Sequence, residues 1–193
     1  VNLEKVTWEF YYYAKNISGS AKSNLTFQSN GYKSYAMALI ALGNIPYTKQ
    51  NFDSALTWYR SALYFSEQNY FEQGIAKDNF NIGRTWRWKN KLDSADLYLN
   101  KALHQLQLFS DEYLKSEVLN ESGVVLQRRE KNIDALKIFE KTLLLKIKLE
   151  DEEGRMRVLA NMGACYSRFG EYDKGKTINL QLMEYYGTKG TEA

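Results

Sequence analysis

The side chains that most often perform catalysis or bind metals are few and scattered in this sequence of 193 residues. It has one histidine, His104, and one cysteine, Cys165, which excludes multi-histidine metal centres, zinc sites with several thiolates and an intramolecular disulfide. Neither residue has a catalytic partner at a suitable spacing. We therefore expect His104 to lie on a surface, and Cys165, which falls within a predicted helix, to have a packed, unreactive thiol. The acidic run from Asp151 to Glu153 is typical of a solvated helix start. Because a phosphate-binding glycine loop, an HExxH motif and a nucleophile elbow are also missing, the sequence predicts no enzyme activity, no cofactor and no metal.

The composition is that of a folded, helix-rich chain. Hydrophobic residues make up 44% and charged residues 25%, which excludes an intrinsically disordered protein. Proline breaks helix interiors, so the presence of only one proline, Pro46, in 193 residues favours long helices. It falls inside a predicted helix, which we expect it to kink. The 26 basic and 23 acidic residues leave a net charge of +3, which is too small to indicate nucleic-acid binding by itself.

The sequence also bears on the cellular compartment. No apolar stretch approaches the 18 or so residues that cross a membrane, so membrane insertion is not expected. The lone cysteine suits a reducing compartment, and we therefore expect a cytoplasmic protein, with a periplasmic sensor segment as the alternative. The first residues contain neither an initiator methionine nor a signal peptide, so the chain is predicted to be a piece of a larger protein.

Small residues recur with a period of forty and indicate repeated helix pairs. Glycines stand at Gly43, Gly83, Gly123 and Gly163, and a small residue follows each of them after twelve positions, at Ala55, Ala95, Ala135 and Gly175. Around each glycine, apolar residues recur three and four apart, then a short polar break occurs, and a second helical pattern follows. The breaks are at 50–51, 90–91, 131–132 and 170–171. Each unit is therefore predicted to be two antiparallel helices, in which we expect the glycine to face the small residue twelve positions later.

This arrangement resembles the tetratricopeptide repeat. The corresponding positions are Leu42, Gly43, Pro46, Ala55, Tyr59 and Ala62 in the first unit, and Ile82, Gly83, Trp86, Ala95, Leu99 and Ala102 in the second. They are Ser122, Gly123, Leu126, Ala135, Phe139 and Thr142 in the third, and Met162, Gly163, Tyr166, Gly175, Asn179 and Leu182 in the fourth. The period of forty rather than 34 implies longer helices, as in a variant found in bacterial regulators. HEAT and armadillo arrays have similar periods, but the spacing of twelve favours the tetratricopeptide pattern.

The resemblance implies an all-α fold, a right-handed superhelical solenoid of antiparallel helix pairs. We expect four full repeats at residues 32–70, 71–111, 112–151 and 152–188. Residues 1–31 are expected to form the second helix of an earlier repeat or an N-terminal cap, and residues 189–193 a tail. Stability is then expected to come from contacts between neighbouring repeats.

In tetratricopeptide arrays the first helices of the pairs line a concave groove that holds partner segments. The face that would line it contains the position three before each glycine and those one, four and five after it. On this basis the predicted partner-binding groove contains Asn44, Tyr47, Phe80, Arg84, Arg87, Trp88, Asn120, Gln127, Arg128 and Arg168. Lys77 and Arg157 extend the same face one turn earlier and belong to the predicted groove as well. Arginine and aromatic residues dominate interface energies, and a guanidinium can hold a carboxylate or a phosphate through two hydrogen bonds. We therefore predict an acidic protein or peptide partner. The alternative is a solvated, internally salt-bridged face.

The function predicted from these features is a non-enzymatic protein–protein interaction scaffold, the tetratricopeptide segment of a larger protein. Its composition looks like that of bacterial regulators, in which such an array senses a peptide and controls an attached signalling domain. Two alternatives remain at this point. One is a self-assembly module, because an array cut at its N-terminus exposes an apolar helix face. The other is a nucleic-acid-binding repeat, which the net charge of +3 disfavours.

Overall fold

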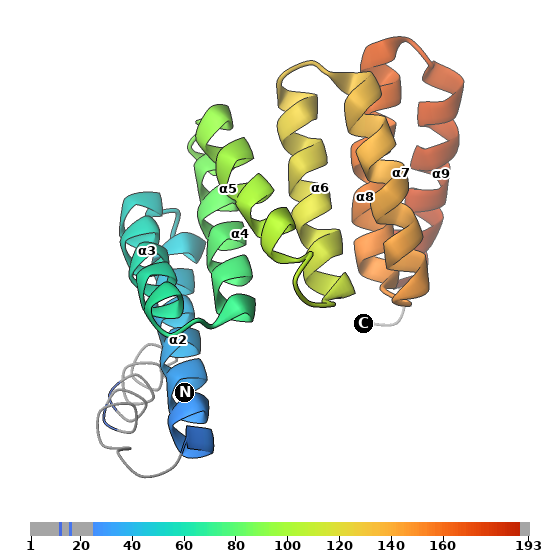
Figure 1. Cartoon of the computed structure of the whole chain (residues 1–193). Coiled ribbons are helices and arrows are strands. Elements are labelled where there is room, and N and C mark those ends of the chain that lie inside the picture. The colour runs from blue at the N-terminus through green and yellow to red at the C-terminus, as the bar shows by residue number, and fades with distance from the viewer. Residues whose placement is uncertain (1–11, 13–15, 17–24, 190–193) are drawn as a thin grey trace. The chain divides into compact units, whose positions relative to one another are not determined.

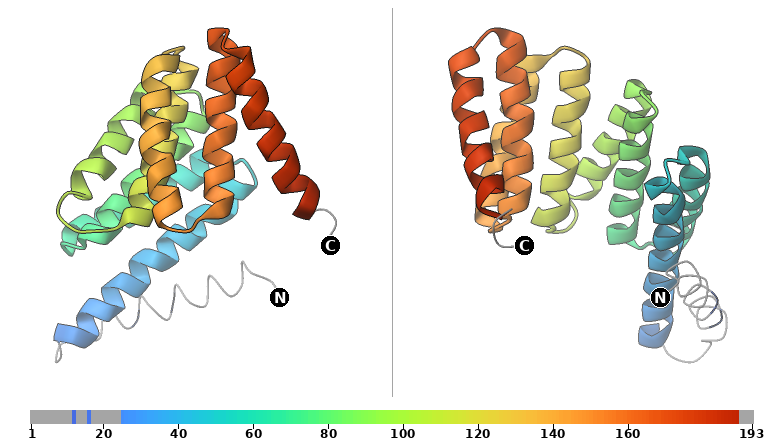
Figure 2. Two further views of the ribbon diagram at one scale, coloured as in Figure 1. Left: turned by 90° about the vertical axis from the view of Figure 1, so that its right-hand side faces the viewer. Right: turned by 180° about the vertical axis from the view of Figure 1, so that it is seen from behind.

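The structure is a computed structural model that describes Tyr12, Asn16 and residues 25–189. Residues 25–189 form eight α-helices in successive antiparallel pairs (Figures 1 and 2). They are α2 (Leu25–Thr48), α3 (Phe52–Gln68), α4 (Glu72–Trp88), α5 (Leu92–Gln105), α6 (Glu112–Arg128), α7 (Asn132–Lys148), α8 (Glu152–Phe169) and α9 (Tyr172–Lys189). The all-α fold of helix pairs is thus confirmed. None of these helices combines the length and the apolar character needed to cross a bilayer.

The described helices belong to two compact units. Helices α2–α5 lie in the unit that ends at Ser110, and α6–α9 lie in the unit that begins at Asp111. Within each unit every helix packs against the next one along the chain. We expected the first repeat to begin at residue 32, but its first helix, α2, already begins at Leu25. The N-terminal cap or half repeat expected at residues 1–31 lies mostly outside the described residues, as does the expected tail apart from Lys189.

The turn inside each helix pair has the same backbone geometry. Each of the four turns contains one residue in the left-handed conformation. These residues are Gln50, Asn90, Glu130 and Gly170, with φ values of 58°, 56°, 63° and 85°. The N–H of the following residue bonds to a carbonyl five positions back, as Asn51 does to Pro46 at 2.8 Å, which is a common way to end a helix. In the third pair this turn begins at Glu130, one residue before the break predicted at 131–132.

The glycines of the first helices allow the second helices to approach closely. On three of the four glycines the side chain that packs lies sixteen positions later, in the pairs Gly43–Tyr59, Gly83–Leu99 and Gly123–Phe139. A Cβ atom on Gly123 would lie 2.5 Å from the ring of Phe139. In these three pairs the side chain nearest the glycine therefore lies one helical turn beyond the small residue that we expected there. In the fourth pair the small residue does lie beside the glycine: a Cβ atom on Gly175 would lie 3.5 Å from the carbonyl oxygen of Gly163.

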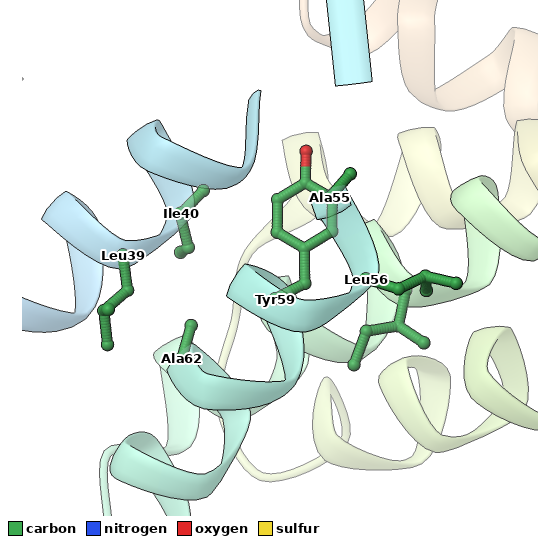
Figure 3. Packing of buried hydrophobic residues seen from close by; sticks show 7 residues of the cluster. Leu39, Ile40, Ala55, Leu56, Tyr59 and Ala62 are labelled. Carbon is green, nitrogen blue, oxygen red and sulfur yellow. The ribbon is translucent and has the colours of Figure 1, made fainter. Parts of the chain in front are cut away.

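Apolar residues from three consecutive helices meet in each unit. In the first unit the cluster contains Leu39 and Ile40 from α2, Ala55, Leu56, Tyr59 and Ala62 from α3, and Ile82 from α4 (Figure 3). In the second unit it contains Ala135 and Phe139 from α7, Val158, Met162 and Cys165 from α8, and Ile178 from α9. Burying one large side chain of this kind stabilises a fold by about 1.5–3 kcal/mol. Packing between neighbouring helices therefore holds the elements that position the candidate site.

A buried polar pair joins α3 to α4. The Asp78 side chain is completely buried; the Ser66 hydroxyl donates to its Oδ2 at 2.8 Å, and its Oδ1 has no hydrogen-bond partner. Burial raises the pKa of Asp78 to about 8, although the hydrogen bond from Ser66 lowers it. The carboxyl group is therefore mostly protonated at neutral pH. Forty and eighty residues later the same position holds Val118 and Val158.

We expect the stability of the protein to fall as the pH rises from about 4 to about 8. The pKa of Asp78 is 3.8 when unperturbed and about 8 in the fold, so between these values the unfolded state binds fewer protons than the folded state. This group should then lower the free energy of unfolding by up to about 1.4 kcal/mol per pH unit. Urea denaturation of the parent and of Asp78→Asn measures the effect. The free energy of unfolding of the variant, relative to that of the parent, should increase as the pH rises. Parallel pH profiles would contradict the assignment.

Gly123→Ala is expected to destabilise the protein. The added methyl group would displace the ring of Phe139, and overpacking of this kind costs about 1–3 kcal/mol. Gly163→Ala is the matched control, because its nearest atom is the Cγ2 of Ile178 at 3.3 Å and alanine favours a helix over glycine by about 1 kcal/mol. Thermal unfolding should show a clear loss for the first variant and little change for the second. Equal losses would show that Phe139 does not lie over Gly123.

Candidate partner-binding site

The residues predicted to line a groove all lie on the first helices of the pairs. In the first unit they are Asn44 and Tyr47 on α2, and Lys77, Phe80, Arg84, Arg87 and Trp88 on α4. In the second unit they are Asn120, Gln127 and Arg128 on α6, and Arg157 and Arg168 on α8. The two sets lie in different units and have different surroundings.

Arg84 in the first unit reaches from α4 towards α2. Its Nη2 donates a hydrogen bond to the Oδ1 of Asn44 at 3.2 Å, and the hydroxyl of Tyr59 donates to the same oxygen at 2.6 Å. The central carbon of the guanidinium lies 4.4 Å from the centroid of the Tyr47 ring and 5.4 Å from that of the Phe80 ring. An amide and two aromatic rings therefore hold this cation in place, through one hydrogen bond and two cation–π contacts.

The guanidinium of Arg84 retains hydrogen-bonding capacity. A guanidinium has five N–H donors in a rigid planar fork, and the buried Nε of Arg84 has no hydrogen-bond partner. Such a fork matches a carboxylate or a phosphate, which can accept two parallel hydrogen bonds. The charge also acts on its neighbour: burial raises the pKa of the Tyr59 hydroxyl, and the positive charge of Arg84 opposes that rise. The site thus presents a positioned cation suited to an anionic group.

A series of aromatic rings extends from Tyr47 to the end of α4. The ring centroids of Tyr47 and Phe52 are 5.9 Å apart, and the ring of Phe52 stacks on that of Trp88 at 6.4 Å. The guanidinium of Arg87 lies 4.5 Å from the centroid of Trp88, which is nevertheless 49% exposed. Arg87 and Phe80 are themselves buried. They support the surface rather than form it, although the sequence pattern predicts both on the face that lines the groove.

In the second unit the predicted residues bond mainly to other parts of the protein. The Oδ1 of Asn120 accepts a hydrogen bond from the Nδ2 of Asn161 at 3.1 Å. The Nε2 of Gln127 donates to the backbone oxygen of Asn161 at 3.2 Å and to the sulfur of Cys165 at 3.3 Å, and Arg168 donates to the Gln127 carbonyl at 3.4 Å. Asn120 and Gln127 are buried, so they connect α6 to α8 instead of lining an open surface. Asn161, which completes this arrangement, was missed by the sequence analysis.

A buried lysine that the sequence analysis also missed organises the other end of α6 and α8. Lys146 on α7 is completely buried and contacts Glu117 at 2.5 Å and Asp151 at 2.7 Å. Its hydrogen bond holds the pKa of Asp151 below the usual value. Arg157, one of the predicted groove residues, pairs with the same Glu117 at 3.1 Å. Arg157 thus already has a carboxylate partner, although half of its side chain is exposed. Arg128 is exposed at the end of α6.

Other parts of the structure offer less chemistry. Among the residues that the structure describes, there is no group of three or more His, Cys, Asp or Glu side chains that could hold a metal ion. His104 is exposed on α5. Two cavities, of about 450 and 650 Å³, lie between α2 and α3 and share Trp58. Among the described residues each has one charged lining residue, Lys49 or Arg60, and neither contains a residue of the predicted groove.

Comparison with known proteins shows the fold. No protein-family model matches the chain, and no curated protein sequence matches it. The chain is similar to BtubC (BKLC) from P. vanneervenii, at 15% identity over 98% of this chain and 93% of that chain, with a TM-score of 0.72. It is similar to the TPR-like repeats of a putative kinesin light chain from Podosopora anserina, at 9% identity over 97% and 94%, with a TM-score of 0.58. A third similar structure is the Rap conjugation gene regulator of plasmid pLS20 in complex with the Phr* peptide, at 14% identity over 86% and 46%, with a TM-score of 0.63. The described helices thus have the fold of a TPR-type helical repeat.

Cys165 is expected to react with a thiol reagent such as DTNB only when the protein unfolds. The thiol is buried, and burial raises its pKa although the hydrogen bond from Gln127 lowers it, so reactive thiolate is scarce. Reaction rates in buffer and in urea measure the protection, with free cysteine as the reference. Complete reaction of the native protein at the rate of free cysteine would contradict the packing around Cys165.

Proposed function

We propose that this chain, whose fold is that of tetratricopeptide-type repeats, is a non-enzymatic scaffold that binds a protein or peptide segment. The observation that carries this proposal is the position of Arg84, held by Asn44 and between the rings of Tyr47 and Phe80. The binding surface that we propose, called the Arg84 face below, consists of Asn44, Tyr47, Lys77, Arg84 and Trp88. Surfaces in which arginine and aromatic residues meet are typical of the sites that dominate protein–protein affinity.

The chemistry of the Arg84 face favours an acidic partner. Lys77, two helical turns before Arg84 on α4, is exposed and adds a second positive charge to the same side of the helix. Because the guanidinium of Arg84 is already held in place, a carboxylate that binds it does not have to order a flexible side chain. A hydrogen bond to a charged group contributes about 1.5–3 kcal/mol. A single acidic residue on the partner could therefore account for a large part of the affinity.

The comparisons support a peptide partner and a regulatory context. The structure of the Rap regulator of plasmid pLS20 contains a bound peptide, so a protein with this fold and low identity is known in a peptide complex. The present chain spans 46% of that protein. We propose on this basis that the chain is the binding segment of a larger bacterial regulatory protein in the cytoplasm.

Arg84→Gln is expected to weaken the binding of acidic peptides by about tenfold or more, because the charged hydrogen bonds are lost. The probe is a set of fluorescent peptides of about ten residues rich in aspartate and glutamate, and the measurement is fluorescence anisotropy at fixed ionic strength. Arg60→Gln is the matched control, since it removes the same charge from α3, where the guanidinium lies 5.6 Å from the ring of Trp86. Circular dichroism verifies that both variants fold.

Two results of this titration would contradict the proposal. Unchanged affinity in Arg84→Gln would exclude this side chain as the anchor. Equal losses in Arg84→Gln and Arg60→Gln would show that the peptides respond to net charge alone. Arg84→Lys should fall between the parent and Arg84→Gln, because lysine keeps the charge but lacks the planar fork.

A further inference from the structure

The smaller of the two cavities between α2 and α3 has the character of a small-molecule site. Its volume is about 450 Å³, and its apolar walls are Leu42, Ile45 and Pro46 from α2 and Trp58 from α3. Sites for small molecules usually have volumes of about 300–1,000 Å³, mostly apolar walls and a few polar groups. No residue of this cavity belongs to the Arg84 face, so it is a separate candidate site.

Pro46 accounts for open space at this place in the first pair. The same position of the repeat holds Trp86, Leu126 and Tyr166 in the following pairs. Each of those three side chains is partly buried and packs against the apolar cluster of its unit. Proline is much smaller than the two aromatic residues. The first pair therefore leaves room where the second and the fourth pair have an aromatic ring.

Hydrogen-bond donors lie at the end of the cavity next to the turn between α2 and α3. They are the ammonium group of Lys49, the amide of Asn51 and the hydroxyl of Ser54. The Oδ1 of Asn51 accepts the backbone N–H of Ser54 at 3.2 Å, so the NH₂ group of the same amide points its donors elsewhere. Lys49 and Asn51 are exposed, which places these donors where a ligand enters.

The charge at this end of the cavity suits an anion. Among the described residues no acidic side chain lines the cavity, and Lys49 is its only charged group. The acidic residue nearest in sequence, Asp53, is paired with Lys89 at 2.8 Å. A carboxylate accepts hydrogen bonds from ammonium, amide and hydroxyl donors, and those that involve a charged donor are the strongest. The cavity therefore combines space for a ring with donors for a carboxylate.

We propose that this cavity, called the Pro46 cavity below, binds a small aromatic carboxylate. The ring of the ligand occupies the space beside Pro46 and contacts Trp58, and its carboxylate accepts hydrogen bonds from Lys49 and Asn51. The first unit then has a site for a small molecule in addition to the Arg84 face. This inference goes beyond the proposed function and does not depend on it.

Isothermal titration calorimetry with three probes tests the chemistry of the ligand. Indole-3-acetate has a ring and a carboxylate, indole-3-acetamide has the same ring without the charge, and cyclohexylacetate has the carboxylate without an aromatic ring. The parent protein should bind indole-3-acetate with a dissociation constant of about 1 mM or lower, as expected for a ligand of this size. Loss of the charged hydrogen bonds should weaken binding of the amide by about tenfold, and cyclohexylacetate should also bind more weakly.

Two substitutions at Pro46 test where the ring lies. Pro46→Trp supplies the residue that the second pair has at this position, so it should fill the space and weaken binding of indole-3-acetate by about tenfold or more. Pro46→Ala is the matched control, because it leaves the space open and should keep the affinity within about twofold of the parent. Both variants remove a proline from a helix and should unfold at a higher temperature, which verifies that they fold.

Lys49→Gln tests where the carboxylate lies. It should weaken binding of indole-3-acetate by about tenfold and leave that of indole-3-acetamide unchanged. Lys91→Gln is the matched control, since it removes the same charge from an exposed position at the next turn of the unit. Arg84→Gln should bind indole-3-acetate as the parent does, so the two proposals fail separately.

Four results would overturn the Pro46 cavity as the site. Equal affinity in Pro46→Trp and the parent would show that the ring lies elsewhere. Equal losses in Lys49→Gln and Lys91→Gln would show a response to net charge alone. Equal affinity for indole-3-acetate and cyclohexylacetate would exclude the aromatic contact. Absence of binding by the parent would exclude the ligand class, and a change of oligomeric state in Pro46→Trp by sedimentation would then identify the cavity as a contact with a second copy.

Discussion

The close approach of two helices at one glycine in each of the first three pairs is the constraint on which the other features depend. At Gly43, Gly83 and Gly123 the missing side chain leaves room for a ring or a leucine side chain that is completely buried. This contact sets which side of the first helix faces its own pair, and the position after the glycine is then directed towards the neighbouring first helix. Asn44 and Arg84, each one residue after a glycine, meet in this way at 3.2 Å. The site is thus a consequence of the packing that builds the repeat.

The repeated geometry contains different chemistry at different junctions. Between α3 and α4 a neutral pair, Ser66 and Asp78, is buried, whereas between α7 and α8 the position of Ser66 is taken by Lys146, which two carboxylates pair. Buried polar groups add little net stability, but an unmatched one costs several kcal/mol. A helix placed at the wrong junction would leave one of these groups without its partner. Such pairs therefore favour the correct order of otherwise similar repeats.

Much of the fold could be predicted from the sequence, because a period of forty and the small residues record the helix pairs directly. The pattern could not distinguish whether Gly123 faces Ala135 or Phe139, since positions twelve and sixteen residues later lie on the same side of the second helix and differ by one turn. The burial of Lys146 was equally hidden. A single lysine in a helix is usually solvated, and its partner Glu117 is 29 positions away with no motif to mark it.

The two units differ in how much of their hydrogen-bonding capacity is already used. In the second unit Asn120, Gln127 and Arg157 each bond to another part of the protein, so a ligand there would exchange one hydrogen bond for another and gain little. At Arg84 the Nε donor is buried and has no hydrogen-bond partner. The unfavourable desolvation of that group has therefore occurred before any ligand arrives. Because a guanidinium has five donors and that of Arg84 donates one side-chain hydrogen bond, to Asn44, the expected binding energy of an acidic ligand is concentrated on the first unit.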